Sequence, residues 1–141
     1  MKWFKKKRIL VPFDFSDESL HAIRVGMAMA EEPGDVHVVH VLHGLPVGVG
    51  FDRPQPSSDQ RKIETKAAIE ERMLNENIRD VEVEVLLGDP ASMLTEYAGQ
   101  IDCDLIVIPS HGYGRLTRML IGSVAQDVVR SAKCPVLVLK D

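Results

Sequence analysis

The sequence predicts an α/β protein in which helices cover both faces of a five-stranded parallel sheet, a three-layer α/β/α sandwich. Short segments rich in Val, Ile and Leu alternate with longer amphipathic segments, and strands that alternate with helices build parallel sheets through helical crossovers. Residues 105–108 are apolar at every position, which is typical of a strand buried on both faces. The chain has 141 residues and is 45% hydrophobic, which predicts a single domain over residues 1–141 with a sizeable core.

The first expected strand covers residues 8–13, and a helix is expected over residues 17–30. Ser16 is the expected N-cap, because a serine hydroxyl accepts a hydrogen bond from a free N–H group of the first helical turn. Pro33 and Gly34 end the helix. Its apolar positions share one face, formed by Leu20, Ile23, Met27 and Ala30.

The second expected strand covers residues 36–42, and a helix is expected over residues 59–77. Residues 43–58 between them are rich in Gly and Pro, which predicts a long mobile loop. Because this loop leaves the carboxyl end of its strand, we expect it to act as a flap over a ligand bound there. The apolar stripe of the helix is expected to consist of Ile63, Ala67, Leu74 and Ile78.

The second half of the chain predicts three further strands. The third covers residues 81–86, and Asp89 caps the helix after it, with Pro90 in the first turn, where a missing N–H costs nothing. The fourth is the apolar strand already described, and a helical stretch at residues 124–130 follows it. The fifth strand is Val136–Leu139.

The residues after the fourth strand indicate a binding site for an anion such as phosphate. Gly112 lets the backbone approach a ligand closely, and Gly122 and Ser123 open a helix with free N–H groups and a positive dipole end. The expected phosphate contacts are the N–H groups of these three residues and the Ser123 hydroxyl. Such glycines are also typical of ordinary strand-to-helix loops. A P-loop lysine is absent, and Thr117 stands where a dinucleotide fingerprint needs its third glycine.

Four motifs, in the same order along the chain, resemble those of the universal stress proteins. Residues 112–123 are similar to the ATP-binding loop of that family, and residues 9–16 resemble its opening strand. Residues 88–90 resemble its third strand-to-helix turn, and residues 134–138 resemble its last strand. One position departs, because Pro109 stands where the family has the first glycine of its loop. The resemblance implies a Rossmann-like sheet with the strand order 3-2-1-4-5.

The resemblance also implies ATP, or AMP or ADP, as the ligand. It implies that Asp14 holds Mg²⁺ through the phosphates, that Pro12 lies near the base and ribose, and that the backbone of Val41 contacts adenine. A turn or helix-cap role is the alternative for Asp14. Arg115 is the better placed of the loop arginines to offset phosphate charge. The nucleotide-binding residues expected in total are Pro12, Asp14, Val41, Pro109, His111, Gly112, Gly114, Arg115, Gly122, Ser123 and Val124.

No catalytic nucleophile is expected, because Ser110 and His111 are sequence neighbours outside any nucleophile elbow. His37, His40 and His43 are not expected to bind one metal ion, because the middle side chain of the three points to the opposite face of the strand. We therefore expect a small regulatory module of the stress response that binds nucleotide and is capable at most of slow ATP hydrolysis. The alternative is a family member that has lost nucleotide binding and acts only through protein contacts.

A phosphoacceptor receiver domain is the strongest alternative from another class, because it has the same architecture. Asp14, Asp89, Ser110 and Lys140 fall near the strand ends where such a domain places its acids, hydroxyl and lysine. However, the first strand ends in a single Asp rather than an acidic pair, and Asp89 has the position of a helix cap. These two departures disfavour the receiver domain.

The composition argues against several partners. A net charge of −4 with both signs interspersed gives no reason to expect nucleic acid, and the basic residues 5–8 are expected to be a solvated lead-in. Without a long apolar stretch or a signal peptide, the protein is expected to be cytoplasmic and independent of membranes. Cys103 and Cys134 are expected to be small hydrophobic residues rather than a disulfide. Val136–Leu139, an edge strand in the implied order, is expected to pair with its copy in a homodimer.

Overall fold

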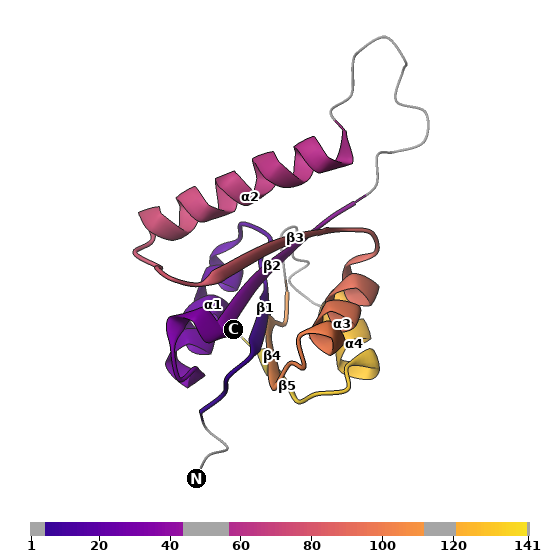
Figure 1. The fold of residues 1–141 in the computed structure, drawn as a ribbon. Coiled ribbons are helices and arrows are strands. Elements are labelled where there is room, and N and C mark those ends of the chain that lie inside the picture. Colours follow the sequence, from indigo (N-terminus) through magenta and orange to yellow (C-terminus); the bar gives the residue numbers. More distant parts are fainter. Residues whose placement is uncertain (1–4, 44–56, 112–120, 141) are drawn as a thin grey trace.

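The computed structural model describes residues 5–43, 57–111 and 121–140 (Figure 1). The expected flap falls largely in residues 44–56, and Gly112, Gly114 and Arg115 fall in residues 112–120, so these predictions lie outside the described residues. The elements in chain order are β1 (Ile9–Pro12), α1 (Asp17–Met29), the 3₁₀ helix η2 (Pro33–Asp35), β2 (Val36–Leu42), α2 (Ser58–Asn75), β3 (Glu82–Leu87), α3 (Pro90–Gln100), β4 (Leu105–Pro109), α4 (Ser123–Ser131) and β5 (Val136–Leu139).

The strands of the described residues form one parallel sheet in the order β3-β2-β1-β4-β5, which confirms the predicted fold class and strand order. The helices α1 and α2 cover one face of this sheet, and α3 and α4 cover the other, which gives three layers (Figure 1). No helix of the described residues has both the length and the apolar character needed to cross a membrane.

Each helical layer has its own core, because successive side chains of a strand point to opposite faces of the sheet. Ile9 and Val11 of β1 pack with Ile23 of α1, whereas Leu10 packs with Leu94 of α3. None of these five side chains is more than 2% exposed. The central strand therefore anchors both layers, and its carboxyl end is held in a fixed position between them.

The element ends lie within two residues of the predicted ones, and the caps explain where the helices begin. Ser16 and Asp89 each accept a hydrogen bond of 3.1 Å from a backbone N–H of the first turn, which confirms both predicted caps. Ser57 caps α2 in the same way, so this helix begins earlier than expected. Gly88 precedes the Asp89 cap with φ = 145°, a conformation that L side chains rarely adopt.

The prediction of which apolar residues of α2 are buried is wrong. Ile63 and Leu74 are 65% and 54% exposed, and Ala67 is exposed as well. The buried residues of α2 are Ile69 and Met73, which lie on a different side of the helix because each residue turns the chain by about 100°. The sequence of α2 offered apolar residues on two sides, and packing against the sheet selected one of them.

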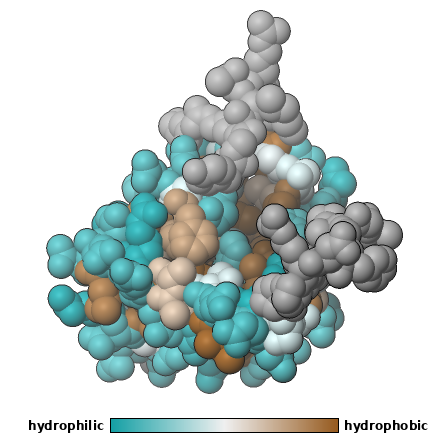
Figure 2. Space-filling view, turned by 90° about the horizontal axis from the view of Figure 1, so that it is seen from above, coloured by the Kyte–Doolittle hydropathy of each residue, from teal (hydrophilic) through white to brown (hydrophobic). Residues whose placement is uncertain are grey.

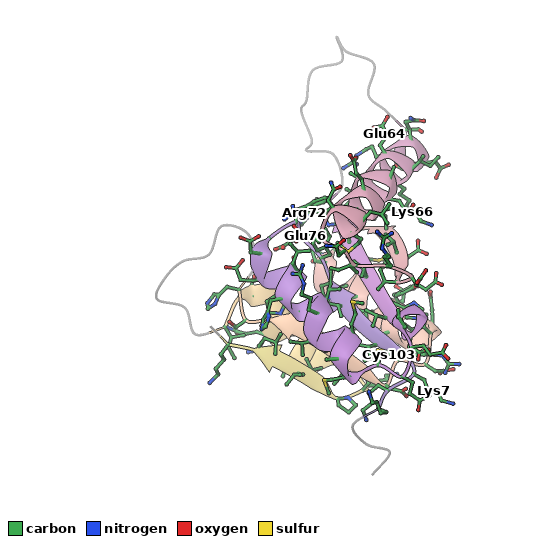
Figure 3. All side chains as sticks on the ribbon, turned by 90° about the vertical axis from the view of Figure 1, so that its left-hand side faces the viewer. Lys7, Glu64, Lys66, Arg72, Glu76 and Cys103 are labelled. Carbon is green, nitrogen blue, oxygen red and sulfur yellow. The ribbon has the colours of Figure 1, made fainter. Side chains whose placement is uncertain are left out.

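The carboxyl end of α2 is tied to α1 by charged side chains (Figure 3). Arg24 of α1 and Arg72 of α2 both pair with Glu76, at 3.1 Å and 3.3 Å. Their hydrogen bonds lower the pKa of the Glu76 carboxyl. Ile78, the last member of the expected stripe, is buried just beyond this end of the helix, so it helps to position α2 without belonging to it.

Candidate functional site

A cleft with a volume of about 680 Å³ lies at the carboxyl edge of the sheet, where β1 and β4 end side by side. The chain continues from β1 into a helix on one face and from β4 toward a helix on the other, and the diverging connections leave a crevice between them. Figure 2 looks onto this edge of the sheet and shows apolar side chains in the middle of the face, framed by hydrophilic ones.

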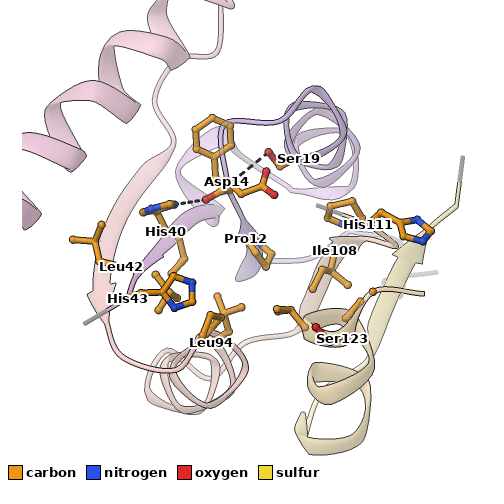
Figure 4. A pocket seen from close by; sticks show the side chains of 18 of the residues that line it. Pro12, Asp14, Ser19, His40, Leu42, His43, Leu94, Ile108, His111 and Ser123 are labelled. Carbon is orange, nitrogen blue, oxygen red and sulfur yellow. Dashed lines mark hydrogen bonds between the residues drawn. The ribbon is translucent and has the colours of Figure 1, made fainter. Parts of the chain in front are cut away.

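The structure brings together every expected site residue that it describes. The expected residues come from the ends of β1, β2 and β4 and from the start of α4, and side chains of α1, α2 and α3 complete the lining (Figure 4). Gly112, Gly114 and Arg115 lie outside the described residues. The eight expected residues that line the cleft are Pro12, Asp14, Val41, Pro109, His111, Gly122, Ser123 and Val124.

The start of α4 is pinned to the end of β4 by a short backbone contact. The N–H of Gly122 donates a hydrogen bond of 2.6 Å to the carbonyl of Ser110. A Cβ atom at position 122 would lie 3.1 Å from the same carbonyl oxygen, so the close approach favours glycine. The Gly122 N–H, which the sequence predicted to contact phosphate, is used by this hydrogen bond in the structure. No side chain of the described residues caps α4, so the N–H groups of its first turn, beginning at Ser123, are left for a ligand in the cleft.

Asp14 serves the turn between β1 and α1 and also lines the cleft. Its carboxylate accepts a hydrogen bond from the Ser16 N–H at 3.0 Å and another from the Ser16 hydroxyl. Between them, Phe15 has φ = 66°, a strained conformation for a residue with a side chain. The turn role, which the sequence left as an alternative, is thus present in the structure. It holds the carboxylate in one place at the edge of the cleft.

The strand histidines lie on different faces of the sheet. His40 lines the cleft, and its Nδ1 lies 2.7 Å from the carbonyl oxygen of Phe13, so it ties β2 to the end of β1. His37 packs on the other face against Tyr97, with ring centroids 6.3 Å apart, and burial lowers its pKa. Among residues 5–43, 57–111 and 121–140, no group of three or more His, Cys, Asp or Glu side chains is arranged to hold a metal ion.

Ser110 and His111 form a hydrogen-bonded pair at the end of β4. The Ser110 hydroxyl lies 3.1 Å from Nδ1 of His111, and Ser110 is only 2% exposed. The other ring nitrogen of His111, Nε2, is buried and has no hydrogen-bond partner within the described part of the chain.

Arg61 of α2 lines the cleft, although it was not among the site residues expected from the sequence. Its guanidinium donates a hydrogen bond of 3.0 Å to the backbone carbonyl of His43, which also lines the cleft. This contact brings a positive charge from the helix after the long loop to the end of β2. The only signal in the sequence was the proximity of Arg61 to the start of a helix, which does not distinguish it from other surface arginines.

Comparison with known proteins places this chain in a family. A sequence model of the universal stress protein family matches residues 6–140. The universal stress protein MJ0531 of Methanocaldococcus jannaschii is 34% identical over 95% of this chain and 82% of its own length. The stress response protein NhaX of Bacillus subtilis is also 34% identical, over 97% of this chain and 99% of its own.

Solved structures give the same result at the level of the fold. The protein MJ0577 has a TM-score of 0.70 and 26% identity, with 96% of both chains covered. A universal stress protein from Archaeoglobus fulgidus, solved in complex with dAMP, has a TM-score of 0.61 and 25% identity, with 93% of this chain and 95% of that chain covered.

Proposed function

Since the chain belongs to the universal stress protein family, we propose that it binds an adenine nucleotide, namely ATP or its di- or monophosphate, in the cleft at the carboxyl edge of the sheet. The observation that carries this proposal is the convergence of the eight described site residues on one cleft. A crevice at a switch point of a parallel sheet is where α/β proteins bind nucleotides. The dAMP complex of the Archaeoglobus fulgidus relative supports adenine nucleotides as the class of ligand.

The two ends of the cleft suit the two ends of a nucleotide. Val39 and Val41 of β2 offer an apolar surface for a base at one end. At the other end, Ser123 and the uncapped first turn of α4 offer a hydroxyl, N–H groups and a positive dipole for phosphate (Figure 4). Pro109 lines the cleft at the end of β4, and its carbonyl oxygen is the group that we expect to meet a ribose hydroxyl.

Asp14 is the residue that would meet Mg²⁺. Among the described residues that line the cleft it is the one carboxylate. Mg²⁺ in nucleotide sites is typically held by one or two carboxylates together with phosphate oxygens and water. The residues present therefore fit the ion only when a nucleotide completes its coordination. When bound, the ion would neutralise phosphate charge, and the hydrogen bonds from Ser16 would keep the carboxylate oriented.

A regulatory role fits the cleft better than rapid catalysis. The Ser110 side chain is only 2% exposed, so its hydroxyl is not presented to a substrate as a nucleophile. Hydrolysis of bound ATP would rely on the cation and a positioned water alone, which is a slow process. The competing function is action through protein contacts without nucleotide, and the specific observation behind it is Pro109 in place of the family's glycine.

Protein purified without added nucleotide should release an adenine nucleotide when it is denatured, and mass spectrometry of the supernatant will detect it. Added ATP should also raise the melting temperature, because a ligand at 100 times its Kd stabilises the native state by about 2.7 kcal/mol. Inorganic phosphate at the same concentration is the matched control, and it should have a much smaller effect. If no adenine nucleotide is released and millimolar ATP, ADP and AMP all leave the melting temperature unchanged, the proposed nucleotide binding is wrong. The competing function, action through protein contacts alone, then replaces it.

We also propose that β5 pairs with its copy in a second subunit. It is an edge strand of the sheet. The carbonyls of Pro135 and Leu139 accept hydrogen bonds from the N–H groups of Ile106 in β4 and of Ser110 directly after β4, at 3.0 Å and 2.8 Å. Because backbone groups alternate in direction along a strand, those of Val136 and Val138 point away from the sheet. An exposed apolar edge invites pairing, and a two-fold copy would satisfy its free groups.

Val138→Pro should convert the dimer into a monomer at micromolar concentration. Proline removes the outward N–H at position 138 but leaves the hydrogen bonds between β4 and β5 in place. Val138→Ala, which keeps the N–H, should remain dimeric. Light scattering after size-exclusion chromatography measures the mass of each variant. A monomeric unmutated protein, or a dimer that tolerates Val138→Pro, would show that this edge is not the interface.

A further inference from the structure

The two cysteines of the chain lie together at the amino edge of the sheet, opposite the nucleotide cleft. Cys103 precedes β4 and Cys134 precedes β5, and these strands are neighbours with Ile106 opposite Val136. Both cysteine side chains pack against the core beneath α3 and α4, so they point to the same face of the sheet. Both side chains line the same groove, and each thiol influences the pKa of the other, so the two lie close together.

The backbone around Cys103 is well fixed. Its thiol lies 3.0 Å from the carbonyl oxygen of Leu105 and 3.4 Å from that of Arg8. The segment before β1 is held at the same place, because the Asp104 carboxylate accepts hydrogen bonds from the N–H groups of Lys7 and Arg8 at 3.0 Å and 3.3 Å. Figure 3 shows Cys103 close to Lys7 at this end of the molecule. The position of one thiol is therefore set by β1 and β4 together.

Small molecules have access to both thiols. The two cysteines are half-buried and free, and both line a surface groove between α3 and α4. Charged side chains of both signs line this groove, the basic Arg130 and Lys133 and the acidic Asp89, Glu96, Asp102 and Asp127. A small disulfide such as oxidised glutathione, which itself carries both ammonium and carboxylate groups, can approach such a groove without having to enter the core.

We propose that Cys103 and Cys134 form a dithiol redox site, in which a low-molecular-weight disulfide oxidises the two thiols to one intramolecular disulfide. The two cysteines are offset by one residue, because Ile106 lies opposite Val136. Neighbouring strands lie about 4.8 Å apart and one residue advances a strand by about 3.3 Å, so such an offset is compatible with the Cα separations of roughly 4.4–6.8 Å that disulfides span. The chain contains no other cysteine, so no third thiol competes within the molecule. The site is separate from the cleft, and the proposal does not depend on nucleotide binding.

The exchange has two balanced steps. The Cys134 thiolate attacks one sulfur of the small disulfide, forming a mixed disulfide and releasing the other half as a thiol that takes up the proton lost by Cys134. Cys103 then loses its proton and attacks Sγ of Cys134, which closes the protein disulfide and releases the second half as a thiol. The small disulfide is thereby reduced to two thiols, and the protein loses two hydrogens.

The order of the two cysteines follows from their surroundings. Burial raises the pKa of both thiols, that of Cys103 to about 12, so both are protonated at neutral pH and react slowly. The Cys103 thiol is held at the carbonyl oxygens of Leu105 and Arg8. We therefore assign Cys134 as the attacking thiol and Cys103 as the one that resolves the mixed disulfide.

Incubation of the full-length protein with oxidised glutathione should consume both thiols. The number of free thiols per protein, measured with a maleimide or with Ellman's reagent, should fall from two to none. Peptide mapping without reduction should find Cys103 linked to Cys134. The disulfide closes residues 103–134 into a loop, which should raise the melting temperature by roughly 5 to 10 °C, and dithiothreitol should reverse the shift.

Two single variants separate the roles. Cys103→Ser should accumulate a stable glutathione adduct on Cys134, because the resolving thiol is gone, and its melting temperature should not rise. Cys134→Ser should react many times more slowly. A stable glutathione adduct on the unmutated protein with the second thiol still free would show that the pair cannot close. Faster reaction of Cys134→Ser than of Cys103→Ser would overturn the assigned order.

Discussion

Gly122→Asp should abolish binding of adenine nucleotide and leave the protein folded. Aspartate is a preferred N-cap, so its carboxylate would hydrogen-bond the first-turn N–H groups of α4 that we assign to phosphate. It would also place a negative charge there. Hydrogen bonds to charged groups contribute about 1.5 to 3 kcal/mol each, so the loss of two weakens binding by roughly 100-fold or more. Calorimetric titration with ATP measures this loss.

The fold should survive this change, because Gly122 has φ = −68°, which any residue adopts. The added Cβ atom meets the Ser110 carbonyl oxygen at 3.1 Å, so a small local shift is expected. Gly122→Ala makes the same steric demand without a charge and is the matched control, expected to weaken binding much less. Unchanged ATP affinity in Gly122→Asp would show that the start of α4 does not hold phosphate.

Pro109→Gly tests the departure from the family pattern and should change ATP affinity only modestly. Proline lacks one N–H, and a typical hydrogen bond is worth about 0.5 to 1.5 kcal/mol, which corresponds to tenfold in affinity at most. The phosphate contacts that we propose at Ser123 do not involve this residue. If the unmutated protein binds no nucleotide and Pro109→Gly restores binding, proline disables the site and the protein acts through other contacts.

Ile69→Ala should lower the free energy of unfolding by about 2 to 5 kcal/mol, because it leaves a cavity in a packed core. Ile69 is 0% exposed and is one of the two residues through which α2 packs on the sheet. Urea unfolding followed by circular dichroism measures the change, with the midpoint shifting and the slope staying constant.

Ile63→Ala on the same helix is the matched control and should change the free energy of unfolding by less than about 0.5 kcal/mol. Ile63 is 65% exposed, so shortening its side chain removes little buried apolar surface and leaves no cavity in the core. The pair of variants measures directly which side of α2 faces the protein. Equal losses at both positions would mean that the stripe expected from the sequence is packed in solution.

Much of the fold could be predicted because the signals are local. The apolar run of β4 needs no neighbour to be recognised as a doubly buried strand, and the caps at Ser16 and Asp89 act on N–H groups three residues away. The strand order came from the resemblance to a family, and the sheet has that order. Once the order is known, the ends of β1 and β4 must lie together, so the lining of the cleft by Asp14 and Pro109 follows.

The errors and omissions have a common physical cause, which is that they depend on contacts between distant residues. The side of α2 that is buried depends on how the helix meets the edge of the sheet. The Gly122 N–H is used because Ser110 lies beside it after folding, and Arg61 reaches the cleft only because α2 passes the end of β2. The sequence by itself determined the elements, the caps at Ser16 and Asp89, and the edge at which we propose that nucleotide binds, since these follow from local hydrogen bonds and hydrophobic periodicity. Only the tertiary structure decided which donors remain free, which helix face is buried and that Cys103 meets Cys134, because these depend on packing across the sheet.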